Sequence, residues 1–66
     1  MEKSYIKLGD FLKINNIAQS GGEAKVLIQS GFVKVNGDIE TRRGKKLNPG
    51  DIVSVNNQEF KVKWKF

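Results

Sequence analysis

Apolar and polar residues follow two different spacings along the 66-residue chain. Near the N-terminus, apolar positions three and four residues apart predict two short helices, over residues 8–15 and 20–30. Their apolar faces are formed by Leu8, Phe11 and Leu12 in the first segment and by Ala24, Leu27 and Ile28 in the second. From residue 33 onward the spacing changes to alternation, which is typical of strands with one buried face. The predicted strands cover residues 33–35, 39–40, 52–55 and 58–66, with a further short strand over residues 4–6.

Caps and turns mark the ends of these elements. Ser20 and Glu23 have the spacing of a capping box, in which each side chain accepts a hydrogen bond from a backbone N–H at the helix start. Gly31 stands where the end of a helix favours a left-handed residue. Asn36-Gly37 is the strongest short signal for a two-residue hairpin turn, and Asn56-Asn57 predicts a second tight turn.

These elements predict one α+β domain over residues 1–66. Two short N-terminal helices would pack on a small, mostly antiparallel sheet of about four to five strands. A chain of this length buries only about 60% of the surface that its unfolded form exposes, so its core is thin. The expected core residues are Leu8, Phe11, Leu12, Ile17, Ala24, Leu27, Ile28, Val33, Val35, Leu47, Ile52, Val53 and Val55.

The charge balance indicates an anionic partner. Twelve Lys and Arg residues against seven Asp and Glu residues give a net charge of +5. Such an excess favours association with nucleic acid or with an anionic membrane surface. No segment approaches the ~20 apolar residues that a membrane span needs, and residues 1–10 lack the apolar core of a signal peptide. We therefore expect a cytoplasmic protein that does not bind membranes.

The residue types needed for common catalytic sites are scarce. The chain has no histidine and no cysteine, and its acidic residues are scattered without a motif that pairs them. The usual bases, thiol nucleophiles and zinc ligands are therefore lacking. We expect a protein that is not an enzyme, with no catalytic residues, no metal site and no cofactor.

The densest charged feature is the segment Arg42-Arg43-Gly44-Lys45-Lys46. Two guanidinium and two ammonium groups in a flexible loop suit the phosphates of a folded RNA. An isolated run of charge is also commonly a solvated loop that keeps a protein soluble. Both interpretations are open at this point.

A pair of glycines begins the second predicted helix. Gly21 and Gly22 would leave backbone N–H groups unshielded, where a phosphate can approach closely. The same pair would also allow the two helices to pack closely, so the pattern does not decide between the two. Lys25, one helical turn further, and Lys7 would extend a basic face across the helices.

The order of these motifs resembles the small RNA-binding domain named after ribosomal protein S-four, also called the alpha-L motif. The residues that carry this resemblance are Leu8, Phe11, Leu12, Ser20, Glu23, Ala24, Leu27, Ile28, Gly31, Val33, Val35, Asn36, Gly37, Gly50 and Asp51. The glycine pair and the basic segment are similar to those of the stand-alone bacterial members of the YaaA/YbcJ type. The chain departs from the family where many members have Arg after the Ser, a second basic residue in the second helix and an acid after the first Leu. Gly21, Val26 and Gly9 stand there instead.

The resemblance implies a monomeric, non-catalytic protein that binds structured RNA, with ribosomal RNA or the ribosome as partner and ribosome assembly as a role. The residues expected to contact RNA are Lys7, Ser20, Gly21, Gly22, Lys25, Lys34, Asn36, Arg42, Arg43, Lys45 and Lys46. Recognition of shape and phosphates is favoured over base stacking, because no aromatic pair has the spacing of a stacking motif. Two alternatives are a protein-interaction module that docks on an acidic partner and a nucleic-acid binder that prefers DNA.

Overall fold

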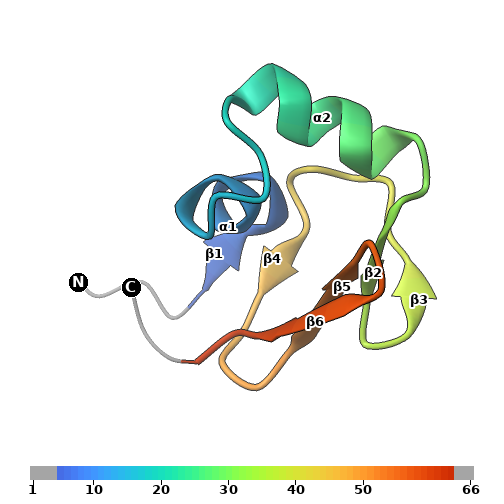
Figure 1. Cartoon of the computed structure of the whole chain (residues 1–66). Helices are drawn as coiled ribbons and strands as arrows, with labels where there is room; N and C mark the ends of the chain where they lie inside the picture. Colours follow the sequence, from blue (N-terminus) through green and yellow to red (C-terminus); the bar gives the residue numbers. More distant parts are fainter. Residues whose placement is uncertain (1–4, 64–66) are drawn as a thin grey trace.

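The computed structural model describes residues 5–63 and consists of two helices and two antiparallel sheets (Figure 1). The elements are β1 (Ile6–Lys7), α1 (Leu8–Ile14), α2 (Gly21–Gln29), β2 (Val33–Val35), β3 (Asp38–Ile39), β4 (Lys46–Leu47), β5 (Ile52–Val55) and β6 (Gln58–Lys61). One sheet pairs β1 with β4, and the other has the strand order β3-β2-β5-β6. The predicted α+β class, with two N-terminal helices packed on antiparallel strands, is confirmed.

The pairing of β1 with β4 is the part of the fold that the sequence pattern did not predict. Ile6 lies opposite Leu47 and Lys7 opposite Lys46, so the last residue of the predicted basic loop is part of a strand. The two strands are about forty residues apart in the chain, and each has only two residues. A ladder this short leaves no alternating pattern to detect, because its pairing is decided by tertiary contact.

The start of α2 has the predicted cap, with one partner shifted. The hydroxyl of Ser20 accepts a hydrogen bond from the N–H of Glu23 at 3.1 Å. The carboxylate of Glu23 accepts from the N–H of Gln19 at 2.7 Å, one residue before the position expected in a capping box. The helix start is therefore fixed from both sides.

Both helices end in the same hydrogen-bond arrangement. At the end of α2, the N–H of Gly31 donates to Ile28 at 3.1 Å and the N–H of Phe32 donates to Leu27 at 3.2 Å. Gly31 has a φ of +84°, as predicted, and Asn16 takes the same place after α1 with a φ of +59°. Neither helix in the described part of the chain is long and apolar enough to cross a membrane.

Two tight turns connect the strands of the larger sheet. Asn36 and Gly37 have φ values of +53° and +90°, and Asn56 and Asn57 have values of +53° and +65°. Positive φ at both central residues matches the turn type that suits the twist of a hairpin. Both predicted turns are confirmed.

The core lies between the helices and the inner faces of the sheets (Figure 1). Its buried residues are Ile6, Leu8, Phe11, Leu12, Ala18, Ala24, Ile28, Val33, Val35, Leu47, Val53, Val55 and Val62. Ile17, Leu27 and Ile52, predicted in the core, are only partly buried. Ile6, Ala18 and Val62 are buried although they were not among the expected core residues.

The C-terminal strand is shorter than predicted. β6 ends at Lys61, and Val62 is still buried because its carbonyl accepts from Gly50 at 2.7 Å and its N–H donates to Asp51 at 2.8 Å. The predicted continuation through Trp64 and Phe66 lies outside the described residues, as does Ser4 of the predicted first strand.

Candidate nucleic-acid interface

The backbone of the basic segment is attached to the start of α1. The N–H of Leu8 donates to the carbonyl of Lys45 at 2.8 Å, and the N–H of Gly9 donates to the carbonyl of Arg43 at 3.0 Å. N–H groups at a helix start have no acceptor within the helix, so these two carbonyls act as its cap. The expectation of a flexible loop is therefore wrong for the backbone, while the side chains of Arg42, Arg43 and Lys46 are exposed.

A surface hollow of about 340 Å³ lies where the starts of both helices meet this segment. We call it the helix–loop hollow; it is lined by Lys7, Gly9, Asp10, Lys13, Gly21, Ala24, Arg43 and Gly44. Three of these residues are cationic and one is acidic. The carboxylate of Asp10 lies 3.6 Å from the ammonium group of Lys13, so the hollow keeps a net positive charge.

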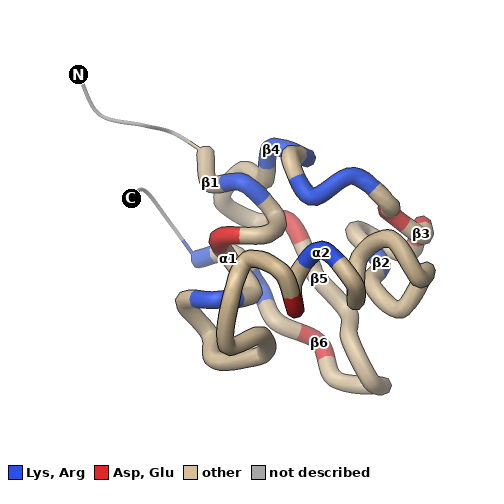
Figure 2. The backbone as a smooth tube through the Cα atoms, turned by 90° about the horizontal axis from the view of Figure 1, so that it is seen from above, with Lys and Arg blue, Asp and Glu red and all other residues tan. Residues whose placement is uncertain are grey.

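A second hollow, of about 470 Å³, is lined by Arg42, Gly44, Lys45 and Lys46. Together with the helix–loop hollow it places cations from β1, α1 and the 42–46 segment on one side of the molecule. Figure 2 shows the Lys and Arg positions of β1, β4 and the segment before β4 along one edge of the molecule, with a basic position of α2 next to it. We define the basic face as Lys7, Lys13, Lys25, Arg42, Arg43, Lys45 and Lys46.

The two glycines at the start of α2 are not required for helix packing. A Cβ added at Gly21 would meet nothing within 4 Å, and one added at Gly22 would meet only the hydroxyl of Ser20 at 3.8 Å. Within residues 5–63, no hydrogen bond uses the N–H of Gly21 or of Gly22. The structure thus favours an open backbone over close packing as the role of this pair. Gly21 lines the helix–loop hollow together with three cationic residues.

Glu40 reduces the charge that Arg42 can offer to a ligand. The Nε group and the backbone N–H of Arg42 donate to the same carboxylate oxygen of Glu40, at 3.0 and 3.1 Å. The side-chain hydrogen bond from Arg42 lowers the pKa of Glu40 below its ordinary value, and the same bond raises the pKa of Arg42. The side chain of Arg42 nevertheless remains 75% exposed.

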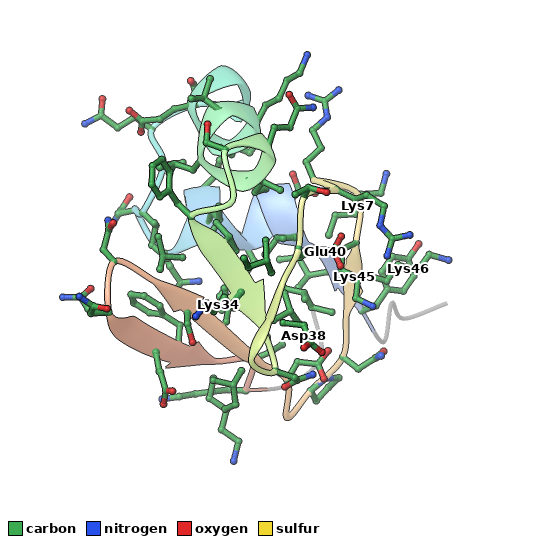
Figure 3. All side chains as sticks on the ribbon, turned by 90° about the vertical axis from the view of Figure 1, so that its right-hand side faces the viewer. Lys7, Lys34, Asp38, Glu40, Lys45 and Lys46 are labelled. Carbon is green, nitrogen blue, oxygen red and sulfur yellow. The ribbon has the colours of Figure 1, made fainter. Side chains whose placement is uncertain are left out.

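Three of the predicted contact residues lie elsewhere or have structural partners. Lys34 projects from the outer face of β2, on the other side of the sheet from Lys7, Lys45 and Lys46 (Figure 3). The side chain of Asn36 donates to Asp51 at 3.2 Å and accepts from the N–H of Ile52 at 2.9 Å, so it joins the hairpin turn to β5. The hydroxyl of Ser20 caps α2.

Sequence reasoning missed Lys13 as part of the basic face. The available signal was its helical spacing: Lys13 follows Gly9 by four residues, so both lie on one side of α1, and both line the helix–loop hollow. A lone Lys in a helix is usually a solvated residue. Only the position of the 42–46 segment places this one in a hollow with other cations.

Known proteins share both the sequence pattern and the fold. The family model described as "S4 domain" matches residues 1–63. The "Probable ribosome maturation protein RlbA" of Bacillus subtilis is 42% identical over 55 residues, which cover 83% of this chain and 78% of that protein. The "Putative RNA-binding protein YbcJ" of Escherichia coli is 38% identical over 58 residues, 88% of this chain and 83% of that one.

Among solved structures, the 30S ribosomal protein S4e of Thermoplasma acidophilum superposes with a TM-score of 0.68 at 19% identity. The match covers 89% of this chain and 31% of that protein, and it shows a common fold. The arrangement of the helix pair and the antiparallel strands is therefore a fold that this chain shares with another protein. The chain belongs to the S4 domain family.

Proposed function

We propose that this protein binds structured RNA through its basic face, that the RNA is ribosomal and that the protein acts in ribosome maturation. The single observation that carries the proposal is the helix–loop hollow, which is lined by Gly21 together with Lys7, Lys13 and Arg43. The names of the relatives support the proposal: one is named "Probable ribosome maturation protein RlbA" and another "Putative RNA-binding protein YbcJ". We propose that it acts as a monomer and without catalysis.

Phosphate groups are the expected ligands of the basic face. A helix start offers N–H groups and a positive dipole end to a phosphate oxygen, and Gly21 lets the backbone approach it closely. Arg43 from the 42–46 segment and Lys7 from β1 also line this hollow, and they would neutralise the same phosphate or its neighbour. Contacts of this kind read the shape of a folded RNA, not its base sequence.

The backbone of the 42–46 segment is held by α1 in the absence of RNA. The carbonyls of Arg43 and Lys45 are held by α1, so the backbone that positions these side chains need not be ordered on binding. Binding is weakened by every segment that must become ordered, and a preformed site avoids that cost.

The test compares two double variants that lose the same charge. Arg43→Ala with Lys45→Ala removes two cations from the basic face, and Lys34→Ala with Lys61→Ala removes two from the outer face of the larger sheet. Binding is measured by fluorescence anisotropy on a blunt hairpin from ribosomal RNA, over a range of salt concentrations. We expect the first variant to bind more weakly. The slope of log K against log salt should decrease in magnitude by about 2, as for two lost phosphate contacts. The outer-face variant should retain nearly the parent slope.

Three further outcomes would overturn the proposal. If duplex DNA of equal length and charge binds as tightly as the hairpin, RNA is not the preferred ligand. If association with ribosomal particles survives nuclease treatment, a protein surface is the partner. Equal losses in both double variants would show that net charge alone is responsible.

A further inference from the structure

The outer face of the four-stranded sheet carries an exposed aromatic residue beside a polar hollow. Phe32 is 59% exposed, although it directly precedes the buried Val33. Alternation along β2 places Lys34 on the outer face, while Val33 and Val35 face the core. Phe32, just before the strand, lines the same hollow as Lys34. A hollow of about 260 Å³ beside them, which we call the Phe32 hollow, is lined by Gly31, Phe32, Lys34, Ser54, Asn56 and Asn57.

We propose that the Phe32 hollow binds an unpaired nucleotide of the same RNA, an inference that rests on the proposed function. The base would stack on the ring of Phe32, since base–aromatic stacking is the common mode of binding single strands. The amide groups of Asn56 and Asn57 offer both donors and acceptors to the edge of a base. The ammonium group of Lys34 would neutralise the adjoining phosphate.

Two rigid features bring these groups together. The helix-end arrangement at Gly31 fixes the backbone of Phe32, whose N–H donates to Leu27 at 3.2 Å. The pairing of Val33 with Val55 then places the Asn56-Asn57 turn beside Phe32. Backbone hydrogen bonds of the fold therefore hold the two segments that line the hollow next to each other.

The size and polarity of the hollow favour a nucleotide over a whole cofactor or an apolar peptide. Its volume is below the ~300–1,000 Å³ of typical small-molecule sites, so it suits one part of a longer ligand. Of its six lining residues, four carry polar or charged side chains and one is aromatic. Glu59, in the same cross-strand row as Lys34 and Ser54, would repel a phosphate. We therefore place the phosphate at the Lys34 end of the hollow.

If Phe32 serves only to stabilise the fold, substitutions should affect RNA binding differently than if its ring stacks on a base. The residue after a left-handed helix end often makes an apolar contact with the last turn of the helix, which here would be Leu27. Leucine at position 32 can keep such a contact but has no ring. Phe32→Leu and Phe32→Tyr therefore form a matched pair, in which only the tyrosine variant can stack.

The experiment uses the full chain and two RNAs, a blunt hairpin and the same hairpin with a single-stranded extension of about six adenosines. We expect the parent to bind the extended RNA more tightly. Phe32→Leu should weaken binding of the extended RNA by about tenfold and leave the blunt hairpin unchanged, and Phe32→Tyr should bind both like the parent. Lys34→Gln should reduce the salt slope by about 1 on the extended RNA only. Adenosine monophosphate alone should not displace the extended RNA, since it lacks the contacts of the basic face.

The outcomes separate this inference from the proposed function. If the parent binds both RNAs equally tightly, the Phe32 hollow takes no nucleotide, whereas RNA binding by the basic face stands. If neither RNA binds, the proposed function fails and this inference fails with it. Ile39 is 60% exposed and lies opposite Lys34, so Ile39→Ala serves as the apolar control. An equal loss in Ile39→Ala, or a concentration-dependent dimer that Phe32→Leu abolishes, would assign this face to a protein partner and overturn the inference.

Discussion

Lys7 and Lys46 lie directly opposite each other in the β1–β4 ladder, with both side chains exposed. Like charges in this relationship destabilise a pair of strands, because the side chains of directly opposite residues are neighbours. The ring of Tyr5 offsets part of this effect, since the ammonium group of Lys46 lies 4.9 Å from its centre. Figure 3 shows Lys7, Lys45 and Lys46 on the same side of the molecule. An anion bound between these lysines would relieve the repulsion, as expected for the basic face.

Lys46→Glu should therefore change stability and RNA binding in opposite directions. The variant replaces a repulsive pair with an attractive one across from Lys7, so the free energy of unfolding should rise by about 0.5 kcal/mol. Affinity for the blunt hairpin should fall, because a cation of the basic face becomes an anion. Urea unfolding and anisotropy on one preparation check both effects. Lys61→Glu, on the outer face of the larger sheet, is the control. If Lys61→Glu weakens RNA binding as much as Lys46→Glu does, the position of Lys46 has no special importance for binding.

Gly21→Glu tests the open helix start. The structure offers free space for the side chain, and residues other than glycine suit a helix better, so stability should stay the same or rise by about 0.5 kcal/mol. The carboxylate would stand where a phosphate is expected, so RNA affinity should fall. Gly21→Gln keeps nearly the same bulk without the charge. If the two variants bind equally poorly, steric exclusion and not charge accounts for the loss; if both bind like the parent, the helix start makes no contact.

Asn36→Gly should affect folding and spare RNA binding. Glycine accepts the positive φ of +53° at this position, so the variant removes only the two side-chain hydrogen bonds to Asp51 and Ile52. We expect a loss of about 1 kcal/mol in the free energy of unfolding. Affinity measured well below the melting temperature should match the parent. A weaker affinity in a fully folded variant would return Asn36 to the RNA contacts predicted from the sequence.

Glu40→Gln should reveal the pH dependence of the pair with Arg42. The pKa of Glu40 is lowered from 4.5, chiefly by the hydrogen bond from Arg42, so the ionised form is favoured in the folded protein. The pair therefore adds stability above the unfolded pKa, and this contribution is lost as the pH falls through the lowered folded pKa. Parent and variant should differ in urea unfolding at neutral pH and converge in acid.

The same substitution should strengthen RNA binding at neutral pH, because Arg42 would no longer share its charge with a carboxylate. The slope of log K against log salt should become steeper by up to about 1. An unchanged affinity and slope would mean that Arg42 does not face the RNA, and the basic face would then begin at Arg43.

Local features were predictable from the sequence because short-range chemistry decides them. The cap at Ser20, the left-handed Gly31 and the Asn36-Gly37 turn each depend on residues within a few positions of one another. The apolar spacing also identified most of the core, since a helix face and a strand face each have their own period. The excess of positive charge was visible as composition alone.

Contacts between distant segments required the folded chain. The β1–β4 ladder joins two strands of two residues each, and the carbonyls of Arg43 and Lys45 accept hydrogen bonds from the start of α1. No local sequence pattern encodes either contact. These contacts turned a predicted flexible loop into a fixed wall of the helix–loop hollow and gave Lys13 a place in it. They also separated Lys34 from the other cations, because the two faces of a sheet point in opposite directions. The sequence by itself determines the charge and the local backbone geometry. The grouping of the charges on one face depends on which distant backbone groups form hydrogen bonds with each other.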